Sequence, residues 1–460
     1  MSNWKECKLG DCIEFIIDNR GKNPPLSDSG YELIETNMIS SNNKYPDFDK
    51  VTKYVSEDTY NNWFRKGHPK IGDILISTVG NIGKVAIVNE DKVCIAQNLI
   101  GLRVNEKIIA EYLYYFLIKK DTQDQLLSLN IGSVQPSIKV PHLLNLEIKI
   151  PELLKQKECI QVLSKLDDKI QLNTQINQTL EQIAQALFKS WFVDFDPVRA
   201  KVQALSDGLS LEQAELVAMQ AISGKTPEEL TALSQTQPDR YAELAETAKA
   251  FPCEMVEVSN SMYIPKGWKI KYFNEIIDTY IDNRGKTPPI EKQGIPLLEV
   301  KHLPKNSVFP DLNTIKYISN DTYENWLRNK PEALDIMLST VGTVGRVNLV
   351  PINNKIAIAQ NILGFRFNQK KATQIYMFYL MKSEKFIFDM EARVVETVQK
   401  SIKRKDLEKI PLLIPTLELQ NLFSKFVIPF VIKQNNSENT NLEKIRNDLL
   451  PKLLSGEIQL

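Results

Sequence analysis

The chain repeats itself, and this repeat constrains the possible folds more than any other feature of the sequence. Five blocks recur in the same order at an offset of 262 to 264 residues. They are IDNRGKNPP from Ile17 and IDNRGKTPP from Ile281, KYVSEDTYNNWFRK from Lys53 and KYISNDTYENWLRN from Lys316, DILISTVGNIGKVAIV from Asp73 and DIMLSTVGTVGRVNLV from Asp335, IAQNLIGLRV from Ile95 and IAQNILGFRF from Ile358, and VQPSIK from Val134 and VQKSIK from Val398. Solenoid repeats have periods of about 20–50 residues, so this longer period is that of a whole domain. We therefore predict two copies of one fold, at residues 1–151 and 262–415.

Within each copy the pattern predicts an α+β fold. The segments DILIS, KVAIV, LIGLRV and LEIKIP are apolar or alternating and are separated by Gly and Asn, which is typical of short strands. EYLYYFLIKK and QIYMFYLMKS have the spacing of amphipathic helices. A further short helix is predicted at TYNNWFRK and at TYENWLRN. Each copy should thus combine an irregular sheet, a few short helices and several loops.

A long helix is predicted after each copy, within residues 152–196 and 416–460, and both helices have the apolar spacing of a coiled coil. The first runs from about Glu152 to Phe192, and its seam residues are Leu163, Leu166, Ile170, Asn173, Asn177, Leu180, Ala184, Leu187 and Trp191. The second seam consists of Ile428, Ile432, Asn435, Asn439, Leu442, Leu449 and Leu453. Arg446 interrupts the second seam, and Pro429 is expected to end or kink that helix early.

Asparagines occupy equivalent positions in the two seams: Asn173 and Asn177, then Asn435 and Asn439. Such residues either face solvent or lie in the seam, where buried asparagines lower stability but fix register and partner. Their recurrence in both helices favours the register role. Antiparallel pairing about a pseudo-two-fold axis near Gln175 would place Asn173 opposite Asn439 and Asn177 opposite Asn435.

Residues 197–261 have no counterpart in the other half of the chain. They are rich in Ala, Leu, Glu and Gln, and we predict two or three short helices followed by a linker. Ser210 and Thr226 are predicted helix N-caps, because Thr226 precedes Pro227 and has Glu229 three residues later.

Composition excludes several classes of protein. No run of about 18 apolar residues is present, which argues against a membrane span, and the first residues lack the apolar core of a signal peptide, so the cytoplasm is expected. The five cysteines and three histidines are scattered, so no metal site is expected. The 57 basic and 57 acidic residues balance, which neither favours nor excludes a nucleic-acid partner, because the local field decides.

Four features together resemble the specificity subunit of type I restriction enzymes: two similar domains, FKSWFVDFDPVRAK at the end of the central helix, an IPKGW entry to the second domain, and LLPKLLSGEI near the end of the chain. The resemblance covers essentially the whole chain. It implies that each domain is a target recognition domain for one half of a split double-stranded DNA sequence. It also implies that the helices act as a spacer and dock two DNA methyltransferase (modification) subunits, with restriction (motor and nuclease) subunits joining that core. The chain departs from the family pattern at Pro429 and in the helical insert after Ala200.

If the resemblance holds, catalysis belongs to the partner subunits. S-adenosylmethionine, ATP and Mg are then expected on those partners, and no cofactor or metal on this chain. Two motif lookalikes agree with this interpretation. NPPL at Asn23 resembles the base-gripping motif of methyltransferases but lacks its aromatic residue, and the second copy has TPPI. GNIGK resembles a phosphate-binding loop, but its spacing is wrong and Val85 replaces the required Ser or Thr.

Polar loops that recur in both copies supply candidate DNA contacts. Cations suit phosphates, whereas Arg, Asn and Gln side chains suit base edges. The candidates lie in the DNRGK segments, the GNIGK and GTVGR turns, and the loops GSVQPSIK and TVQKSIKRK: Arg20, Lys22, Asn81, Lys84, Gln135, Lys139, Arg284, Lys286, Arg346, Gln399, Lys403 and Arg404. Any one of them could be an ordinary solvated side chain. Their recurrence on loops of both copies favours a function.

The duplicated order of domain, helix, domain, helix suggests how such a chain would read DNA. A helix near 40 residues spans about 60 Å at about 1.5 Å per residue, enough to set two major-groove contacts one or two turns apart. Because the domains are so similar, the half-sites are predicted to be similar when read in opposite orientation. Two other classes stay open: a coiled-coil adaptor that reads no DNA, and a degenerate fused methyltransferase.

Overall fold

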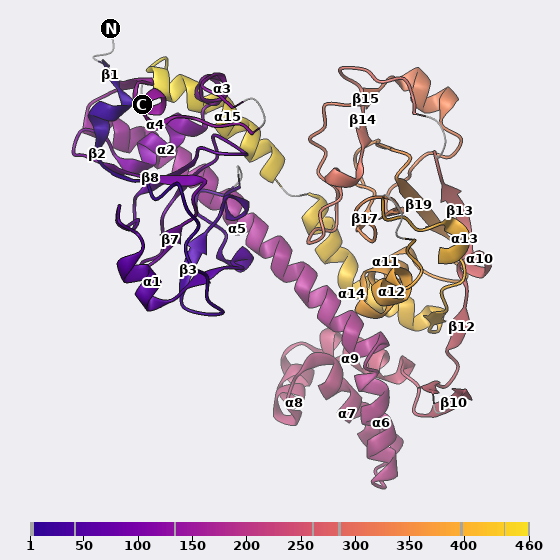
Figure 1. Cartoon of the computed structure of the whole chain (residues 1–460). Helices are drawn as coiled ribbons and strands as arrows, with labels where there is room; N and C mark the ends of the chain where they lie inside the picture. Colours follow the sequence, from indigo (N-terminus) through magenta and orange to yellow (C-terminus); the bar gives the residue numbers. More distant parts are fainter. Residues whose placement is uncertain are drawn as a thin grey trace. The chain divides into compact units, whose positions relative to one another are not determined.

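The computed structural model describes residues 4–40, 43–132, 135–259, 262–283, 287–395, 399–436 and 438–458. The chain divides into two compact units. Unit 1 consists of Met1–Thr174 and Glu438–Leu460, and unit 2 of Gln175–Ser437 (Figure 1). Each unit contains one copy of the sequence repeat, together with the helical segments that pack on it.

Unit 1 is built around a four-stranded antiparallel sheet in the order β2-β8-β5-β6. A three-stranded sheet, β4-β3-β7, and a two-stranded ladder, β1-β9, complete it. The strands are β1 (Lys5–Lys8), β2 (Ile13–Ile17), β3 (Tyr31–Ile34), β4 (Tyr54–Val55), β5 (Ile74–Ser77), β6 (Val85–Ile87), β7 (Cys94–Ile95), β8 (Leu99–Val104) and β9 (Glu147–Ile150). The short helices are α1 (Glu57–Asn62), α2 (Ala110–Ile118), α3 (Lys120–Ser128) and α4 (Val140–Leu144), with 3-10 turns η1 (Leu9–Cys12), η2 (Thr36–Met38) and η3 (Phe48–Lys50).

Two helices cover the repeat of unit 1 and run antiparallel to each other. They are the amino-terminal part of α5 (Leu153–Phe192) and the last helix, α15 (Asn439–Ser455). Hydrogen bonds pair Cys159 with Leu453, Asp167 with Arg446, and Asn173 with Asn439, so one helix ascends while the other descends. The apolar side chains of these two helices, including Leu163 and Leu450, pack with those of α2 in one core.

Unit 2 repeats the same sheets. The orders are β13-β19-β16-β17, β15-β14-β18 and β12-β20, each equivalent to one in unit 1, and a ladder β10-β11 is added. The strands are β10 (Met255–Ser259), β11 (Met262–Pro265), β12 (Lys269–Lys271), β13 (Ile277–Ile281), β14 (Ile295–Leu298), β15 (Tyr317–Ile318), β16 (Ile336–Ser339), β17 (Val347–Leu349), β18 (Ala357–Ile358), β19 (Ile362–Phe367) and β20 (Leu412–Ile414). The helices of the repeat are α10 (Phe273–Ile276), α11 (Gln374–Lys382), α12 (Glu384–Glu391) and α13 (Arg404–Leu407), with a 3-10 turn η4 (Val300–His302) and a π-helical turn η5 (Thr322–Trp326). The predicted α+β class, the duplication, and the strands and helices expected within each copy are confirmed.

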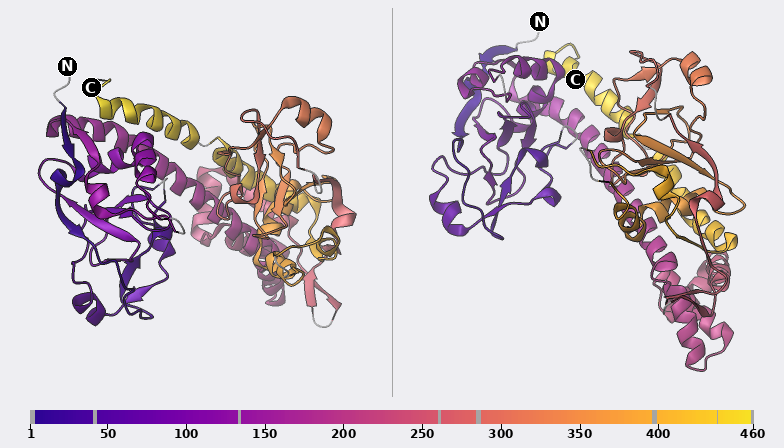
Figure 2. Two further views of the ribbon diagram at one scale, coloured as in Figure 1. Left: turned by 45° about the horizontal axis from the view of Figure 1, so that its top comes forward. Right: turned by 45° about the vertical axis from the view of Figure 1, so that its right-hand side comes forward.

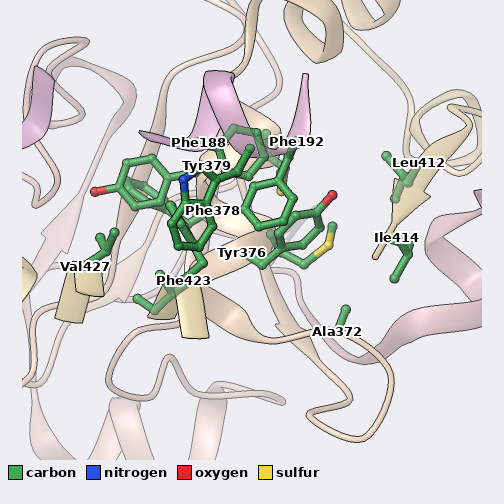
Figure 3. Packing of buried hydrophobic residues seen from close by; sticks show 14 of the residues in the cluster. Phe188, Phe192, Ala372, Tyr376, Phe378, Tyr379, Leu412, Ile414, Phe423 and Val427 are labelled. Carbon is green, nitrogen blue, oxygen red and sulfur yellow. The ribbon is translucent and has the colours of Figure 1, made fainter. Parts of the chain in front are cut away.

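The core of unit 2 joins its repeat to three helical segments. Phe188 and Phe192 of α5 meet Tyr376 of α11 and Phe423 of α14 (Leu417–Asn435), with ring centroids 5.0 to 5.7 Å apart (Figure 3). The third segment is the insert, whose helices gather around the carboxyl-terminal end of α5 in all views (Figures 1 and 2). These are α6 (Asp196–Ser206), α7 (Leu211–Ser223), α8 (Pro227–Thr236) and α9 (Pro238–Ala250). Its four helices exceed the two or three predicted, while Ser210 and Thr226 are N-caps as expected.

Of the predictions about the C-terminal helical segment, the seam positions before Asn435 were wrong, and of the expected end or kink at Pro429 the end is contradicted. Pro429 does not end α14, which continues to Asn435, because the buried side chains on either side of the proline, Val427 and Val431, hold the helix on the core. The helix ends instead at the polar run after Asn435, and α15 starts at Asn439. The predicted seam residues Ile428 and Ile432 are exposed, whereas the neighbouring positions Val427 and Val431 are buried.

The seam asparagines behave differently from one another. Asn173 donates a 3.0 Å hydrogen bond to Asn439, which also donates to the backbone of Ile170. The expected Asn177–Asn435 pair is absent, because Asn435 accepts from the backbone of Ile352 at 2.9 Å. Whether any of these residues sets register stays a prediction.

Candidate nucleic-acid interface

The turn after β5 has the same internal bonding as the turn after β16. In unit 1 the Ser77 hydroxyl donates to the backbone oxygen of Asn81 at 2.6 Å and accepts from the backbone N–H of Lys84 at 2.8 Å. In unit 2 Ser339 makes the same two bonds with Thr343 and Arg346. Two glycines in each turn have φ between 78° and 91°, a region that favours glycine. Both turns therefore present the next side chains in the same way.

A second loop lies directly beside each turn. The backbone N–H of Gly80 donates to Pro136 at 2.8 Å, and that of Ile138 donates to Thr78 at 2.8 Å. In unit 2 Gly342 donates to Lys400 at 2.8 Å and Ile402 to Thr340 at 3.0 Å. The fold thus brings the predicted candidates of two distant loops to one end of the four-stranded sheet, in both units.

Several candidates are exposed at this end of the sheet. In unit 1 these are Asn81, Gln135 and Lys139, and in unit 2 they are Gln399 and Lys403. Gln135 lies over its turn, since its Nε2 atom is 3.4 Å from where a Cβ atom on Gly80 would be. Lys22 is also exposed, on the neighbouring loop after β2.

Other candidates are held by intramolecular bonds. Arg20 forms a two-point ion pair with Asp18, with both contacts at 2.7 Å, and lies 3.5 Å from the Thr78 hydroxyl. Lys84 donates to the backbone oxygen of Thr36 at 3.1 Å, and burial together with the charge of Lys50 lowers its pKa. These cations therefore brace the loops as well as charging them.

In unit 2 the candidate cations are held by different contacts. Arg346 donates to the backbone oxygen of Leu303 at 2.8 Å. The guanidinium of Arg404 lies 3.5 Å from the ring centroid of Tyr280, and its Nε atom is 2.9 Å from Glu408. Arg284 and Lys286 lie outside the described residues.

One glutamine in each unit, which was not predicted, anchors the repeat to the helix after it. Gln156 accepts from the backbone N–H of Ile109 at 2.8 Å and donates to Pro151 at 2.9 Å. Its equivalent, Gln420, makes the corresponding bonds with Thr373 and Pro415 at the same distances. Both glutamines are fully buried. Their recurrence in PELLKQ and PTLELQ, at the repeat offset, was the signal that could have found them.

A partly buried carboxylate on α5 forms a second feature that was missed. In unit 1 Asp167 accepts from the Tyr115 hydroxyl at 2.6 Å and from Arg446 at 2.8 Å. Arg446, predicted to interrupt a seam, is thus a buried member of an ion pair. Burial and the Asp167 charge raise the pKa of Tyr115 far above its ordinary value, so it remains a proton donor.

No group of three or more His, Cys, Asp and Glu side chains among the described residues is arranged to hold a metal ion. No helix within that part of the chain is long and apolar enough to cross a membrane.

Comparison with known proteins identifies the family to which this architecture belongs. The family model of the type I restriction modification DNA specificity domain matches twice, at residues 1–182 and 265–447. The chain belongs to this family. Each match of the specificity family covers one repeat and adjoining helical residues.

Relatives support the same assignment along the whole length. The chain is 37% identical over 481 aligned positions to the type I restriction enzyme HindI specificity subunit of Haemophilus influenzae, with 100% of both chains covered. It is 24% identical over 393 positions to the MjaIX specificity subunit of Methanocaldococcus jannaschii, covering 85% of this chain and 78% of that one. Among solved structures, the S subunit of a type I restriction-modification system from M. genitalium matches with a TM-score of 0.45 and 15% identity, covering 98% and 96% of the two chains.

Proposed function

We propose that this chain directs a type I restriction-modification complex to a two-part DNA sequence, each repeated domain reading one half. The supporting observation is the pair of adjoining polar loops at the end of each four-stranded sheet, at 78–84 beside 135–139 and at 340–346 beside 399–403. Both loop pairs combine cations suited to phosphates with amide side chains suited to base edges. An adaptor that read no DNA would have no need for this duplicated polar surface.

The proposal assigns catalysis to other subunits. Two methyltransferase subunits would dock on the helical segments, and motor and nuclease subunits would join them. S-adenosylmethionine, ATP and Mg would be bound by those partners, and the complex would work in the cytoplasm. The names of the relatives, as specificity subunits of restriction enzymes, support this division of labour.

Sequencing of modified bases on single DNA molecules tests the proposal directly. DNA from a host with this gene and its neighbouring modification gene should carry methylation at one split motif, and deletion of this gene alone should abolish it. The tagged chain should also capture a methyltransferase in stoichiometric amount, and the complex should bind DNA containing that motif. Capture without sequence-dependent binding would instead indicate an adaptor, and methylation by this chain alone would indicate a fused methyltransferase.

The same experiment tests the nature of the two half-sites. Because the loops of the two domains are so similar, we expect half-sites that resemble one another when read in opposite orientation. Two wholly unlike half-sites would reject that expectation without affecting the proposed function.

A further inference from the structure

The two repeated domains differ sharply in charge despite their common fold. Residues 262–415 contain 24 Lys and Arg against 16 Asp and Glu, a net charge of +8. Residues 1–151 contain 18 against 19, a net charge of −1. The balanced charge of the whole chain therefore conceals one basic domain and one almost neutral domain.

Part of the difference lies in one segment, whose net charge is +3 against +1 at the equivalent positions of the first domain. Residues 400–409, KSIKRKDLEK, contain five cations, whereas the equivalent residues 136–145, PSIKVPHLLN, contain only Lys139 and a histidine. This basic segment, as we call residues 400–409, belongs to the interface described above, since it hydrogen-bonds to the turn after β16 through Gly342 and Thr340. The extra charge is therefore placed where DNA would meet the domain.

The basic segment is firmly held while its charges face outward. Ile402, Leu407 and Ile410 are each 1% exposed, so they fix the backbone on the core of unit 2. Lys403 and Lys405 lie between these anchors and are exposed. Neither ammonium group has an ion pair or hydrogen bond among the described residues, in contrast to Lys409, whose Nζ lies 3.5 Å from Asp406.

A polar triad supports this arrangement in unit 2 alone. The Tyr280 hydroxyl donates to Glu408 at 2.9 Å, and Arg404 lies against the Tyr280 ring while contacting the same carboxylate. These contacts fasten α13 to β13. The equivalent positions in unit 1 are Ile16, Val140 and Leu144, all apolar. All three positions of the anchor have thus changed character together, and Arg404 acts as a positioning residue for the lysines on either side.

We propose that the basic segment is a DNA-backbone clamp found only in the second domain, which therefore supplies most of the salt-dependent affinity of the complex. This inference rests on the proposed function and deepens it. Contacts between lysine and phosphate release counterions, so they strengthen binding to any sequence and weaken as salt rises. The first domain, lacking such a clamp, would depend more on contacts that read bases.

The experiment compares wild-type complex with a complex containing Lys403→Gln/Lys405→Gln, using duplexes with and without the modified motif over a series of salt concentrations. Each phosphate contact contributes about 0.9 to the slope of log affinity against log salt. The double variant should lower the magnitude of that slope by about 1.8, with the same fold-loss of affinity on both duplexes. The methylated motif should stay unchanged.

A control removes the same charge from the other end of the sheet, where Lys371 also donates to the backbone oxygen of Glu275 at 2.7 Å. Ser339 of β16 pairs with Ile362 of β19 and Ile336 with Phe365, so Lys370 and Lys371, which follow β19, lie away from the turn. Lys370→Gln/Lys371→Gln should leave the slope within about 0.3 of wild type, a small part of one contact. An unchanged slope in the Lys403 and Lys405 variant, or an equal decrease in both variants, would overturn the clamp. Wild-type complex that bound both duplexes equally would instead overturn the proposed function.

Discussion

Both units contain a cluster of a tyrosine, a carboxylate and a cation, but the two clusters use different charged residues. Each repeat has a buried tyrosine, Tyr115 or Tyr379, at the same position, and each tyrosine donates to a carboxylate on α5. In unit 1 the carboxylate is Asp167 and its cation, Arg446, comes from α15. Unit 2 uses Glu181, which accepts from Tyr379 at 3.0 Å and from Lys382 of α11 at 2.5 Å.

The comparison teaches that each unit keeps a cation beside its α5 carboxylate, although the residues that form the pair differ. A buried ion without a partner is costly, so each carboxylate keeps a cation beside it. Lys382 stands where the first repeat has Ile118, so the cation of unit 2 could not have been found by transferring residues from unit 1. The difference also changes what is fastened, since the ion pair of unit 1 joins two helices and that of unit 2 joins the repeat to α5.

Removing Asp167 should destabilise unit 1 strongly, because it breaks an ion pair whose cation is buried. In the Asp167→Ala variant, the Arg446 side chain, 8% exposed, would lose its carboxylate. Breaking a buried pair in this way costs about 3–5 kcal/mol. Hydrogen exchange of the α15 backbone should therefore accelerate by about 10²- to 4 × 10³-fold, since about 1.4 kcal/mol corresponds to a factor of ten.

Two further variants make that result interpretable. Asp168→Ala changes the exposed neighbour and should leave exchange in α15 nearly unchanged. Asp167→Leu/Arg446→Leu removes both charges and should recover most of the lost protection, because no buried ion remains. Less than tenfold acceleration in Asp167→Ala would show that the pair does not hold α15.

Replacing the buried glutamines should have the same effect in both units. Gln156→Ala and Gln420→Ala each leave a buried backbone N–H and a carbonyl without their side-chain partner, at a cost of about 1–3 kcal/mol. We expect equal losses of hydrogen-exchange protection, in α2 for the first variant and in α11 for the second. Gln161→Ala, at an exposed position of α5, is the control. A large loss in one unit with none in the other would mean that equal geometry conceals unequal energetics.

Acid should affect unit 2 through a histidine that unit 1 lacks at that position. His302 accepts from the backbone N–H of Glu299 at 2.9 Å, and the equivalent residue in unit 1 is Met38. Burial, assisted by the charge of Lys301, lowers the pKa of His302, although Asp311 and Glu299 oppose the shift. The unfolded chain therefore binds the extra proton more readily than the folded chain does.

It follows that the contribution of His302 to the free energy of unfolding is complete above about pH 6.5 and declines as the pH falls below it. His302→Met should flatten the acid loss of exchange protection in β14 and β15 between pH 7.5 and 5.5. Unit 1 has its own half-buried histidine, His68, whose pKa burial also lowers, so acid sensitivity there should persist in the variant. Identical pH profiles of β14 and β15 in wild type and variant would exclude His302 as the source.

The sequence predicted the duplicated fold and the long helix α5, because repetition and apolar periodicity determine these features. Blocks at a constant offset established two copies of one fold, and apolar spacing located α5 almost to the residue. The sequence did not predict that the 78–84 turn and the 135–139 loop adjoin, because that contact depends on backbone hydrogen bonds between segments far apart in the sequence. Recurrence had singled out residues of both loops as candidate DNA contacts without predicting that the loops adjoin, and their roles as DNA contacts stay predictions.

The errors arose where tertiary packing outweighed local preference. Pro429 should stop a helix by its lost N–H, yet the buried residues around it carry α14 onward to Asn435. Arg446 does interrupt the apolar seam, as expected, but its pairing with Asp167 could not be foreseen, because Asp167 lies on another helix far away in the sequence. Neither outcome could be deduced from one helix alone.

The smallest expected effects concern the seam asparagines, where sequence equivalence and structure diverge. Asn173 and Asn177 are both half-exposed, but only Asn173 is hydrogen-bonded across the seam, to Asn439. Asn173→Ala should therefore cost about 1 kcal/mol, the net value of an ordinary hydrogen bond, seen as roughly fivefold faster exchange at the start of α15. Asn177→Ala should stay within about 0.5 kcal/mol of wild type. If both substitutions cost the same, a pairing of Asn177 with Asn435 in solution would be restored as the better description, and the asymmetry of the two seams would be lost.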